Sequence, residues 1–268
     1  MCLILIAHRA CAEYPLVIAA NRDEAYARDA LPADWWQECP QVYGGRDAVA
    51  GGGWLALSTS GRYAAITNYR QGGTRDTALR TRGELVRDYL CGEHELHGYV
   101  DAVHRRGSSY NGFSFLAGDR ERLYFVSNRG NGISVVTPGV HGLSNHLLDE
   151  PWPKVVSGTR CLRDWLSFPE DVLAAHLYEY LADRTMAPDH LLPSTGVDMQ
   201  RERELSAAFI ADERYGTRAS TVIIVHACGD AYFGERGFGP QGRPLYVRAQ
   251  RLRLQARAHA RDVDTGGS

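Results

Sequence analysis

The second residue of the chain is a cysteine, and it begins an apolar run, residues 2–6, that is typical of a β-strand. Initiator methionines are usually removed before a small residue, and loss of Met1 would leave a thiol and a free α-amine together on Cys2. The α-amine has an unperturbed pKa of about 7.7 to 8.0, so it can act as a base near neutral pH. The resulting thiolate attacks amide or thioester carbonyls. For Cys2 alone, the alternative is an ordinary buried strand cysteine.

A carboxylate is predicted to lie beside this cysteine. A second apolar run, residues 15–20, leads directly into the polar sequence Asn-Arg-Asp-Glu at residues 21–24. Two apolar runs separated by a polar turn predict a hairpin or two neighbouring strands of one sheet. This geometry brings Asp23 back to Cys2, where its carboxylate could orient the α-amine. The alternative for residues 21–24 is a turn that ends the strand through local hydrogen bonds.

Three more polar side chains lie at the ends of predicted strands. Asn68 ends a predicted hairpin in residues 51–68, and Asn145 closes a later block with the sequence Gly-Leu-Ser-Asn. An Asn amide donates hydrogen bonds without changing charge, which suits it to binding an oxyanion. Arg218 lies where a loop enters the strand predicted at residues 220–226, and its guanidinium could stabilise a thiolate or bind a substrate carboxylate. Turn chemistry for the Asn residues and a surface charge for Arg218 are the alternatives.

The elements that must position these residues come in blocks. Helical patterns are predicted at residues 82–90, 93–106, 152–165, 170–182 and 201–209. Besides the hairpins already named, strands are predicted at residues 113–117, 122–127, 133–137, 220–226, 231–236 and 244–249. Residues 31–53 are predicted to be irregular.

This order lacks the strict strand–helix alternation of a doubly wound fold. It predicts an α+β fold, a four-layer αββα sandwich of two mostly antiparallel sheets packed face to face with helices outside. No linker or internal repeat divides the sequence, so a single domain is expected over residues 1–254. Residues 255–268 are predicted to be a frayed tail.

The composition is that of a soluble globular protein, with 268 residues of which 44% are hydrophobic and 23% charged. A formal net charge of -2 gives no electrostatic case for binding nucleic acid or an anionic membrane. His8 and Arg9 interrupt the first apolar run far short of a membrane span. We therefore expect no nucleic acid partner, no stable membrane insertion and a cytoplasmic location. Lys154 is the only lysine among 30 lysine and arginine residues, as a coding bias toward arginine would produce.

Six cysteines are scattered without a Cys-x-x-Cys pair, which argues against zinc or thioredoxin-type chemistry, and no disulfide is expected in a reducing cytosol. His94, His97 and His104 share a predicted helix and raise a metal or haem hypothesis, but no cluster of Cys or carboxylates with ligand spacing accompanies them. A solvated helix face is favoured, and no metal site is predicted. Trp54 could line an apolar ligand cleft, with core packing as the alternative.

Taken together, the polar motifs resemble the NRDE family, also called the transport and Golgi organisation type. The match extends over most of the chain in the expected order and rests on Cys2, NRDE at residues 21–24, GGGW at 51–54, TNYR at 67–70, GLSN at 142–145 and GTRAST at 216–221. That family resembles the N-terminal nucleophile hydrolases, whose αββα sandwich agrees with the predicted layers. Cysteine members of that class, such as bile-salt and penicillin amidases, cleave linear amides.

The resemblance implies roles for particular residues. It implies as catalytic residues Cys2, Asp23, Asn68, Asn145 and Arg218, and we expect substrate contacts from Asn21, Arg22 and Trp54. One departure concerns the arginine of the amidases, which tends to lie directly before the Asn of an Asn-x-Asp motif. Here Ala20 precedes Asn21, and the arginine is Arg22. The sequence leaves open whether Arg22 replaces it.

Two functions are compatible with this pattern. One hypothesis is an enzyme that cleaves a non-peptide C–N amide, or a thioester, through an acyl-Cys2 intermediate and requires no cofactor. The other is a binding protein on the same scaffold that carries haem, or an acyl-CoA or other lipid, in an apolar cleft, because the resembled family has been linked to haem trafficking and lipid homeostasis. The expected partner is therefore a small-molecule amide, acyl or haem ligand. Only catalysis of this kind requires a free α-amine on Cys2.

Overall fold

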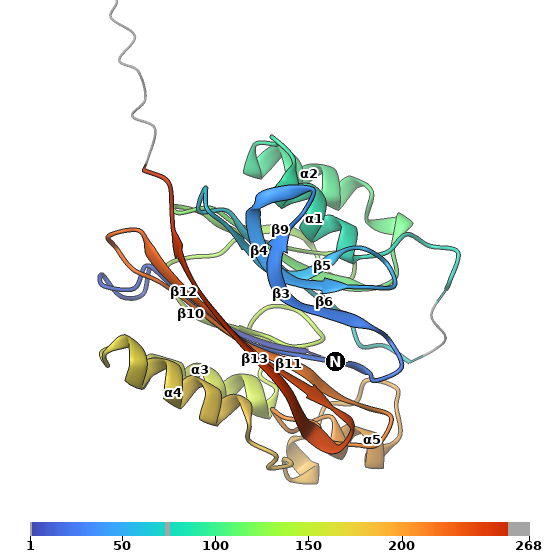
Figure 1. Ribbon diagram of the computed structural model, residues 1–268. Helices are drawn as coiled ribbons and strands as arrows, with labels where there is room; N and C mark the ends of the chain where they lie inside the picture. Colours follow the sequence, from blue (N-terminus) through green and yellow to red (C-terminus); the bar gives the residue numbers. More distant parts are fainter. Residues whose placement is uncertain (1, 73–75, 257–268) are drawn as a thin grey trace, which may run out of the picture.

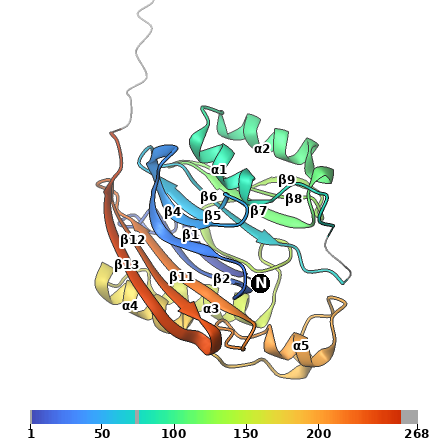
Figure 2. The ribbon, with the colours of Figure 1, turned by 45° about the vertical axis from the view of Figure 1, so that its right-hand side comes forward.

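Two β-sheets lie face to face in the middle of the molecule, and α-helices cover the outer face of each sheet (Figure 1). The computed structural model describes residues 2–72 and 76–256 of the chain. The layers run helix, sheet, sheet, helix, as the turned view in Figure 2 also shows. This arrangement confirms the predicted α+β class and the αββα sandwich.

The first sheet carries the N-terminal hairpin. Its strand order is β10-β1-β2-β11-β12-β13, and every neighbouring pair is antiparallel. The strands are β1 (Cys2–His8), β2 (Leu16–Ala25), β10 (Gly139–Leu143), β11 (Tyr215–Val225), β12 (Asp230–Gly239) and β13 (Arg243–Arg253). In the β1–β2 pair, Cys2 lies opposite Arg22 and Ile4 lies opposite Ala20. This register confirms the predicted hairpin.

The second sheet is an antiparallel meander in which the strands are neighbours in chain order. Its strands are β3 (Ala30–Trp36), β4 (Cys39–Asp47), β5 (Gly53–Ser58), β6 (Tyr63–Asn68), β7 (Phe113–Gly118), β8 (Leu123–Ser127) and β9 (Gly132–Val135). The hairpin predicted in residues 51–68 is therefore confirmed as β5 and β6.

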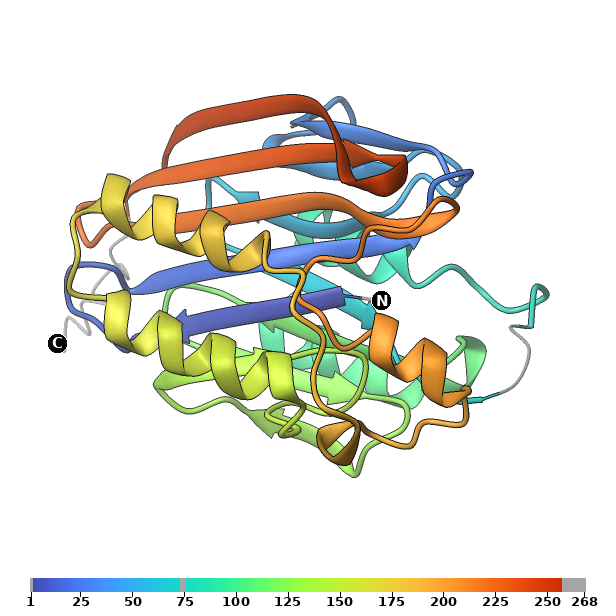
Figure 3. The same cartoon turned by 90° about the horizontal axis from the view of Figure 1, so that it is seen from below.

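The helices divide between the two outer faces. The α-helices are α1 (Gly83–Cys91), α2 (Leu96–Arg105), α3 (Pro153–Trp165), α4 (Glu170–Leu181) and α5 (Met199–Glu204), and the short 3-10 helices are η1 (Gly107–Ser109), η2 (Asp189–Leu191) and η3 (Pro240–Gly242). Helices α1 and α2 pack on the second sheet, whereas α3 and α4 lie side by side across the first (Figure 3). Within residues 2–72 and 76–256, no helix is long and apolar enough to cross a bilayer.

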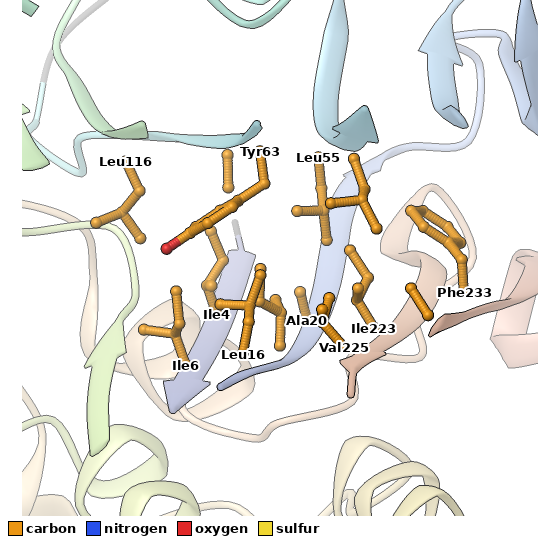
Figure 4. Close-up of a cluster of buried hydrophobic side chains, with 14 of the residues drawn as sticks. Ile4, Ile6, Leu16, Ala20, Leu55, Tyr63, Leu116, Ile223, Val225 and Phe233 are labelled. Carbon is orange, nitrogen blue, oxygen red and sulfur yellow. The ribbon is translucent and has the colours of Figure 1, made fainter. Parts of the chain in front are cut away.

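Apolar side chains fill the space between the sheets and the space beneath each helical layer. Ile4 and Ile6 point into the layer between the sheets, where Leu55 and Phe233 also lie (Figure 4). Successive strand residues point to opposite faces, so Leu3 belongs instead to the cluster beneath α3 and α4. Strand β1 is buried on both faces, which explains its unbroken apolar run.

The prediction that residues 31–53 are irregular is wrong. Strands β3 and β4 form a hairpin there, with β3 at the edge of the second sheet. The pairing is interrupted at two places, one of them between Leu31 and Asp34, and such bulges break the period-two pattern that would identify a strand. Pro32 also obscures the strand, although an edge strand tolerates proline because its outer N–H groups need no partner.

Two further boundaries differ from the prediction. Strand β2 runs through residues 21–24 to Ala25, because β11 pairs with this polar segment and keeps it extended. Helix α5 ends at Glu204, before the predicted residue 209. Of the tail predicted at residues 255–268, residues 257–268 lie outside the described residues.

The expectation of no disulfide is also wrong, since Cys39 and Cys91 are bonded to each other. Their Cα atoms are 5.5 Å apart, although 52 positions separate them in the sequence. Cys39 begins β4 and Cys91 ends α1, and the two meet because α1 packs across the second sheet. No short sequence motif marks such a pair. The thiols of Cys2, Cys11, Cys161 and Cys228 are free.

Replacing both Cys39 and Cys91 with Ala is expected to lower the free energy of unfolding by about 2–4 kcal/mol without reductant, because a disulfide restricts the unfolded chain. Urea unfolding measures this difference. Reductant should bring the unfolding midpoint of the wild type close to that of the double variant. If reductant leaves the unfolding midpoint of the wild type unchanged, the Cys39–Cys91 disulfide is not present.

Candidate active site

The residues predicted to do chemistry meet at the end of the sandwich where β1 begins. Cys2 and Arg22 are opposite each other across the β1–β2 pair, on the face that looks toward the second sheet. They line a small cavity of about 70 Å³ that also reaches the start of α1. Its other walls are formed by Asp23, Glu24, Arg28, Asp47, Gly53, Trp54, Ile66, Asn68, Thr81, Arg82 and Gly83. Of the predicted site residues, Cys2, Arg22, Asp23, Trp54 and Asn68 are thus brought together.

Cys2 is held by its backbone. Its N–H donates a hydrogen bond to Oδ1 of Asn145 over 2.8 Å, and its carbonyl oxygen accepts one from Oγ of Ser144 over 2.9 Å. Removal of Met1 would turn this nitrogen into the α-amine. Burial raises the pKa of the Cys2 thiol, and the charge of Asp23 adds to the rise, whereas the charge of Arg22 opposes it. The thiol therefore needs a nearby base to ionise near neutral pH.

Asn145 positions the nitrogen of Cys2, which differs from the oxyanion role expected for it. The side chain is completely buried. Besides accepting from Cys2, its amide donates from Nδ2 to the carbonyl oxygen of Asn68 over 2.8 Å. This bond fastens the end of β6 to the start of β1, and so it joins the two sheets at the cavity. Asn68 also lines the cavity, and an oxyanion role for its amide stays a prediction.

Asp23 lies next to Arg22 on β2 and is 2% exposed. Its Oδ1 accepts a hydrogen bond from Oγ1 of Thr217 over 2.7 Å, and its carbonyl oxygen accepts one from the Tyr215 hydroxyl over 3.0 Å. Burial raises the pKa of the Asp23 carboxyl, and the charge of Lys154 and the Thr217 hydrogen bond oppose that rise. Strand β11, which supplies Thr217, therefore holds the carboxylate behind Cys2.

Arg22 supplies positive charge to the cavity. Its guanidinium is 7% exposed and pairs through Nη2 with Oδ2 of Asp47 over 3.0 Å. Arg28 binds the same carboxylate through two nitrogens. Nη1 of Arg22 is buried and has no hydrogen-bond partner among the residues that the structure describes. A buried donor without a partner is costly, so this nitrogen is suited to an oxygen of a ligand.

The wall opposite Cys2 depends on close backbone contact. A Cβ atom added to Gly52 would lie 2.4 Å from the carbonyl carbon of Gly83, so a larger residue cannot occupy this position. The contact places the first turn of α1 against the start of β5. Trp54 on β5, only 7% exposed, forms part of the same wall.

Asn21 does not reach the cavity, so the expectation of a substrate contact is corrected. Its side chain points toward the helical layer and is completely buried. Nδ2 donates to the carbonyl oxygens of Leu181 and Ala208 over 2.8 and 2.7 Å, and Oδ1 accepts from Ser220 over 2.6 Å. Asn21 therefore fastens the end of α4 and the chain after α5 to the first sheet.

Arg218 is also absent from the wall of the Cys2 cavity. Its Nη1 donates to the carbonyl oxygens of Ala25, Tyr26 and Arg28, at distances from 2.8 to 3.2 Å. The reason is a register shift in the β2–β11 pair on either side of Arg218, which turns this residue out of the regular alternation. The structure thus assigns Arg218 to the turn after β2.

Two charged groups beside the site escaped the sequence interpretation. Arg70 pairs with Glu202 of α5 over 2.5 Å, with both side chains almost completely buried. The backbone N–H of Arg70 also donates to the carbonyl oxygen of Asn145 over 2.6 Å. Lys154 is the second group, and it lies buried at the start of α3. Two sequence features could have marked these residues. Arg70 comes two residues after Asn68, and Lys154 is the only lysine of the chain.

His94 precedes α2, and His97 and His104 lie on this helix. Among the described residues, no three His, Cys, Asp or Glu side chains are grouped so that they could hold a metal ion. The ring of His94 lies 5.3 Å from that of Tyr99, and the ring of His97 lies 5.6 Å from that of Tyr124. The second contact packs α2 on β8, whereas the first lies at the start of the helix.

The order of the layers identifies the fold. The fold is that of the N-terminal nucleophile hydrolases. A solved structure of a Caenorhabditis elegans ortholog of N-acylethanolamine-hydrolyzing acid amidase matches with a TM-score of 0.51, covering 83% of this chain and 92% of that chain. The two sequences are 15% identical, so the likeness concerns the fold alone.

The family model of Transport and Golgi organisation 2 matches residues 1–240, and the chain belongs to this family. It is 38% identical over 239 residues to the Bos taurus Transport and Golgi organization protein 2 homolog, a match that covers 83% of this chain and 86% of the relative. The Homo sapiens homolog is 36% identical with the same coverage. The Drosophila melanogaster protein is 26% identical over 253 residues, which are 85% of this chain and 89% of the relative. The resemblance found in the motifs is confirmed.

Arg70→Met is expected to lower the free energy of unfolding by about 3–5 kcal/mol, because it leaves the buried Glu202 carboxylate without its partner. Denaturant unfolding measures the loss. Adding Glu202→Gln should recover part of it, since the neutral amide is less costly to bury. A single variant as stable as the wild type would show that the pair does not anchor α5.

Proposed function

We propose that this protein is an amidase in which removal of Met1 makes Cys2 the N-terminal residue and its thiol forms an acyl intermediate. The observation that carries the proposal is the hydrogen bond from the Cys2 nitrogen to Asn145, in a cavity that the thiol shares with Arg22 and Asp23. The same nitrogen would become the α-amine, already fixed beside the thiol. A strand cysteine with only a packing role requires none of these polar neighbours.

The reaction follows from these positions. The α-amine takes the proton from Sγ, and the thiolate attacks the carbonyl carbon of the amide. The Asn68 amide donates to the oxyanion that forms. When the C–N bond breaks, the ammonium of Cys2 returns its proton to the leaving amine, and an acyl thioester with Sγ remains. Water then attacks the thioester, which releases the carboxylic acid and restores the thiol.

Arg22 provides the ligand contact that the amidases obtain from an earlier arginine. Ala20 and Arg22 point to the same face of β2 because they are two residues apart, and Arg22 is the one opposite Cys2. Its unpartnered Nη1 can donate to the carbonyl oxygen or to a carboxylate of the substrate. In this proposal Arg22 replaces the missing arginine.

The size of the cavity bears on the substrate and on the rival function. Ligand pockets usually enclose about 300–1,000 Å³, whereas the Cys2 cavity encloses about 70 Å³. It accommodates a scissile amide or thioester but not a porphyrin or a whole acyl-CoA. An open groove of about 500 Å³, lined by Leu31, Pro32 and Trp35, shares Asp47 with the cavity and can receive the rest of a substrate. The polar walls favour the enzyme over the carrier of haem or lipid.

Cys2→Ala is expected to reduce turnover by about three orders of magnitude or more, because the nucleophile is lost while the buried site keeps its shape. The assay would use fluorogenic amides of aminomethylcoumarin with short, medium and long acyl chains. Cys228→Ala is the matched control, because this thiol is exposed and outside the cavity. Turnover that survives in the Cys2→Ala protein would refute the proposal.

Arg22→Met is expected to raise KM by about 10- to 100-fold, because a hydrogen bond to a charged group contributes about 1.5–3 kcal/mol. Steady-state kinetics on the best amide measures the change. Arg28→Met is the comparison, since it removes the other arginine that binds Asp47. Equal effects of the two variants would mean that Arg22 acts only through Asp47.

A further inference from the structure

The only lysine of the chain is buried behind the candidate active site. Lys154 is the second residue of α3 and is 4% exposed. Its Nζ donates to the carbonyl oxygens of Leu205 and Ala207, over 3.0 and 3.2 Å. An ammonium has three donors, so these bonds use only part of its capacity. Burying a charge in this way is costly unless an opposite charge compensates it.

Asp23 is the compensating group. Burial lowers the pKa of Lys154 to about 8, and the charges of Asp23 and of the Cys2 thiolate oppose this fall. Lys154 is therefore mostly charged at neutral pH. The effect is mutual, because the charge of Lys154 also opposes the rise that burial causes in the pKa of Asp23. Both side chains are buried on the helical side of the first sheet, and the charge of each favours the charged form of the other.

Several of the other charges around Cys2 are held in ion pairs. Arg70 is paired with Glu202 from α5, and Arg22 on β2 is paired with Asp47 from β4. Arg28 shares Asp47 with Arg22. Arg22 and Arg28 outnumber the single Asp47 carboxylate, so this group leaves the cavity with a positive charge, and Glu24 and Arg82 also line the cavity. Asp23 and Lys154 lie instead on the helical side of the first sheet, behind the nucleophile.

We propose that Lys154 is a positioning residue for the proposed N-terminal nucleophile: its fixed positive charge offsets Asp23, so that the thiol and α-amine of Cys2 release their first proton near neutral pH. Together these two groups are unreactive while both are protonated. Losing one proton makes them reactive, whether the thiol or the amine gives it up. Without Lys154, the negative charge of Asp23 would keep this proton on Cys2, because a carboxylate stabilises a neighbouring ammonium.

The packing explains how Lys154 reaches the reaction through Asp23. The segment that receives the Lys154 hydrogen bonds continues to Ile210, whose backbone N–H and carbonyl oxygen both bond to Thr217. Thr217 in turn donates to the Asp23 carboxylate. Lys154 thus fixes the segment that orients Thr217, whose hydroxyl binds Asp23. It also balances the charge of the Asp23 carboxylate.

The test measures the rate of Cys2 alkylation by iodoacetamide as a function of pH, on full chains in which cleavage of an N-terminal fusion exposes Cys2. Intact mass confirms the new N-terminus, and peptide mapping separates Cys2 from the exposed Cys228, which serves as internal reference. Lys154→Met should move the midpoint for Cys2 upward by about one pH unit, or tenfold in rate at a fixed lower pH. Cys228 should not change.

Three companion variants distinguish an effect of the Lys154 charge from an effect of its packing. Lys154→Arg keeps the charge and should return the midpoint toward the wild type. Asp23→Asn should move it downward, and Lys154→Met with Asp23→Asn should bring it back toward the wild-type value. If Lys154→Met does not fold, the Asp23→Asn shift and the double variant still decide the matter. An unchanged midpoint in folded Lys154→Met, or in Asp23→Asn, would overturn the proposal.

This experiment is independent of turnover. A protein with shifted alkylation midpoints but no activity toward any amide would retain the role of Lys154 and refute the amidase. Turnover of an amide, together with alkylation midpoints that do not change in the Lys154 variants, would support the amidase and refute the role of Lys154.

Discussion

The antiparallel pairing of β1 with β2 sets Cys2 opposite Arg22, and the positions of the other site groups depend on that register. A shift by one residue would move the thiol from the cavity to the helical layer, because side chains alternate between the faces of a sheet. Because β1 is apolar and buried on both faces, its core residues would tolerate either register, and the hydrogen bonds of the Cys2 backbone to Asn145 and Ser144 oppose the shift. These polar contacts thus determine where the nucleophile lies.

Groups from distant parts of the chain then complete the site around this hairpin. Asn145 ties the Cys2 nitrogen to the end of β6 and so links the two sheets. Thr217 from β11 holds the Asp23 carboxylate, and Lys154 from α3 compensates its charge. Each contact joins elements that are far apart in sequence. The site therefore depends on every layer of the sandwich, and a substitution that destabilises one layer is expected to disturb it.

Local sequence patterns were enough to predict the hairpin, the two-sheet fold and the approach of Asp23 to Cys2, because neighbouring apolar runs pair directly. They were not enough for Asn21 and Arg218. Asn21 faces the helices through strand alternation, and a bulge redirects Arg218. Sequence spacing also could not reveal Lys154, since nothing in α3 indicates that this helix packs behind β1. The disulfide was missed for the same reason, namely that tertiary packing creates it, whereas bulges and Pro32 concealed the β3–β4 hairpin.

Whether Cys2 is an N-terminal nucleophile can be decided from the mass of the purified protein before and after brief exposure to a thiol-directed electrophile. We expect a chain that has lost Met1 and gains the label first on Cys2, although this thiol is far more buried than that of Cys228. A chain that keeps Met1, or that takes up label on Cys228 while Cys2 stays unmodified, would contradict the account and favour a ligand carrier on the same fold.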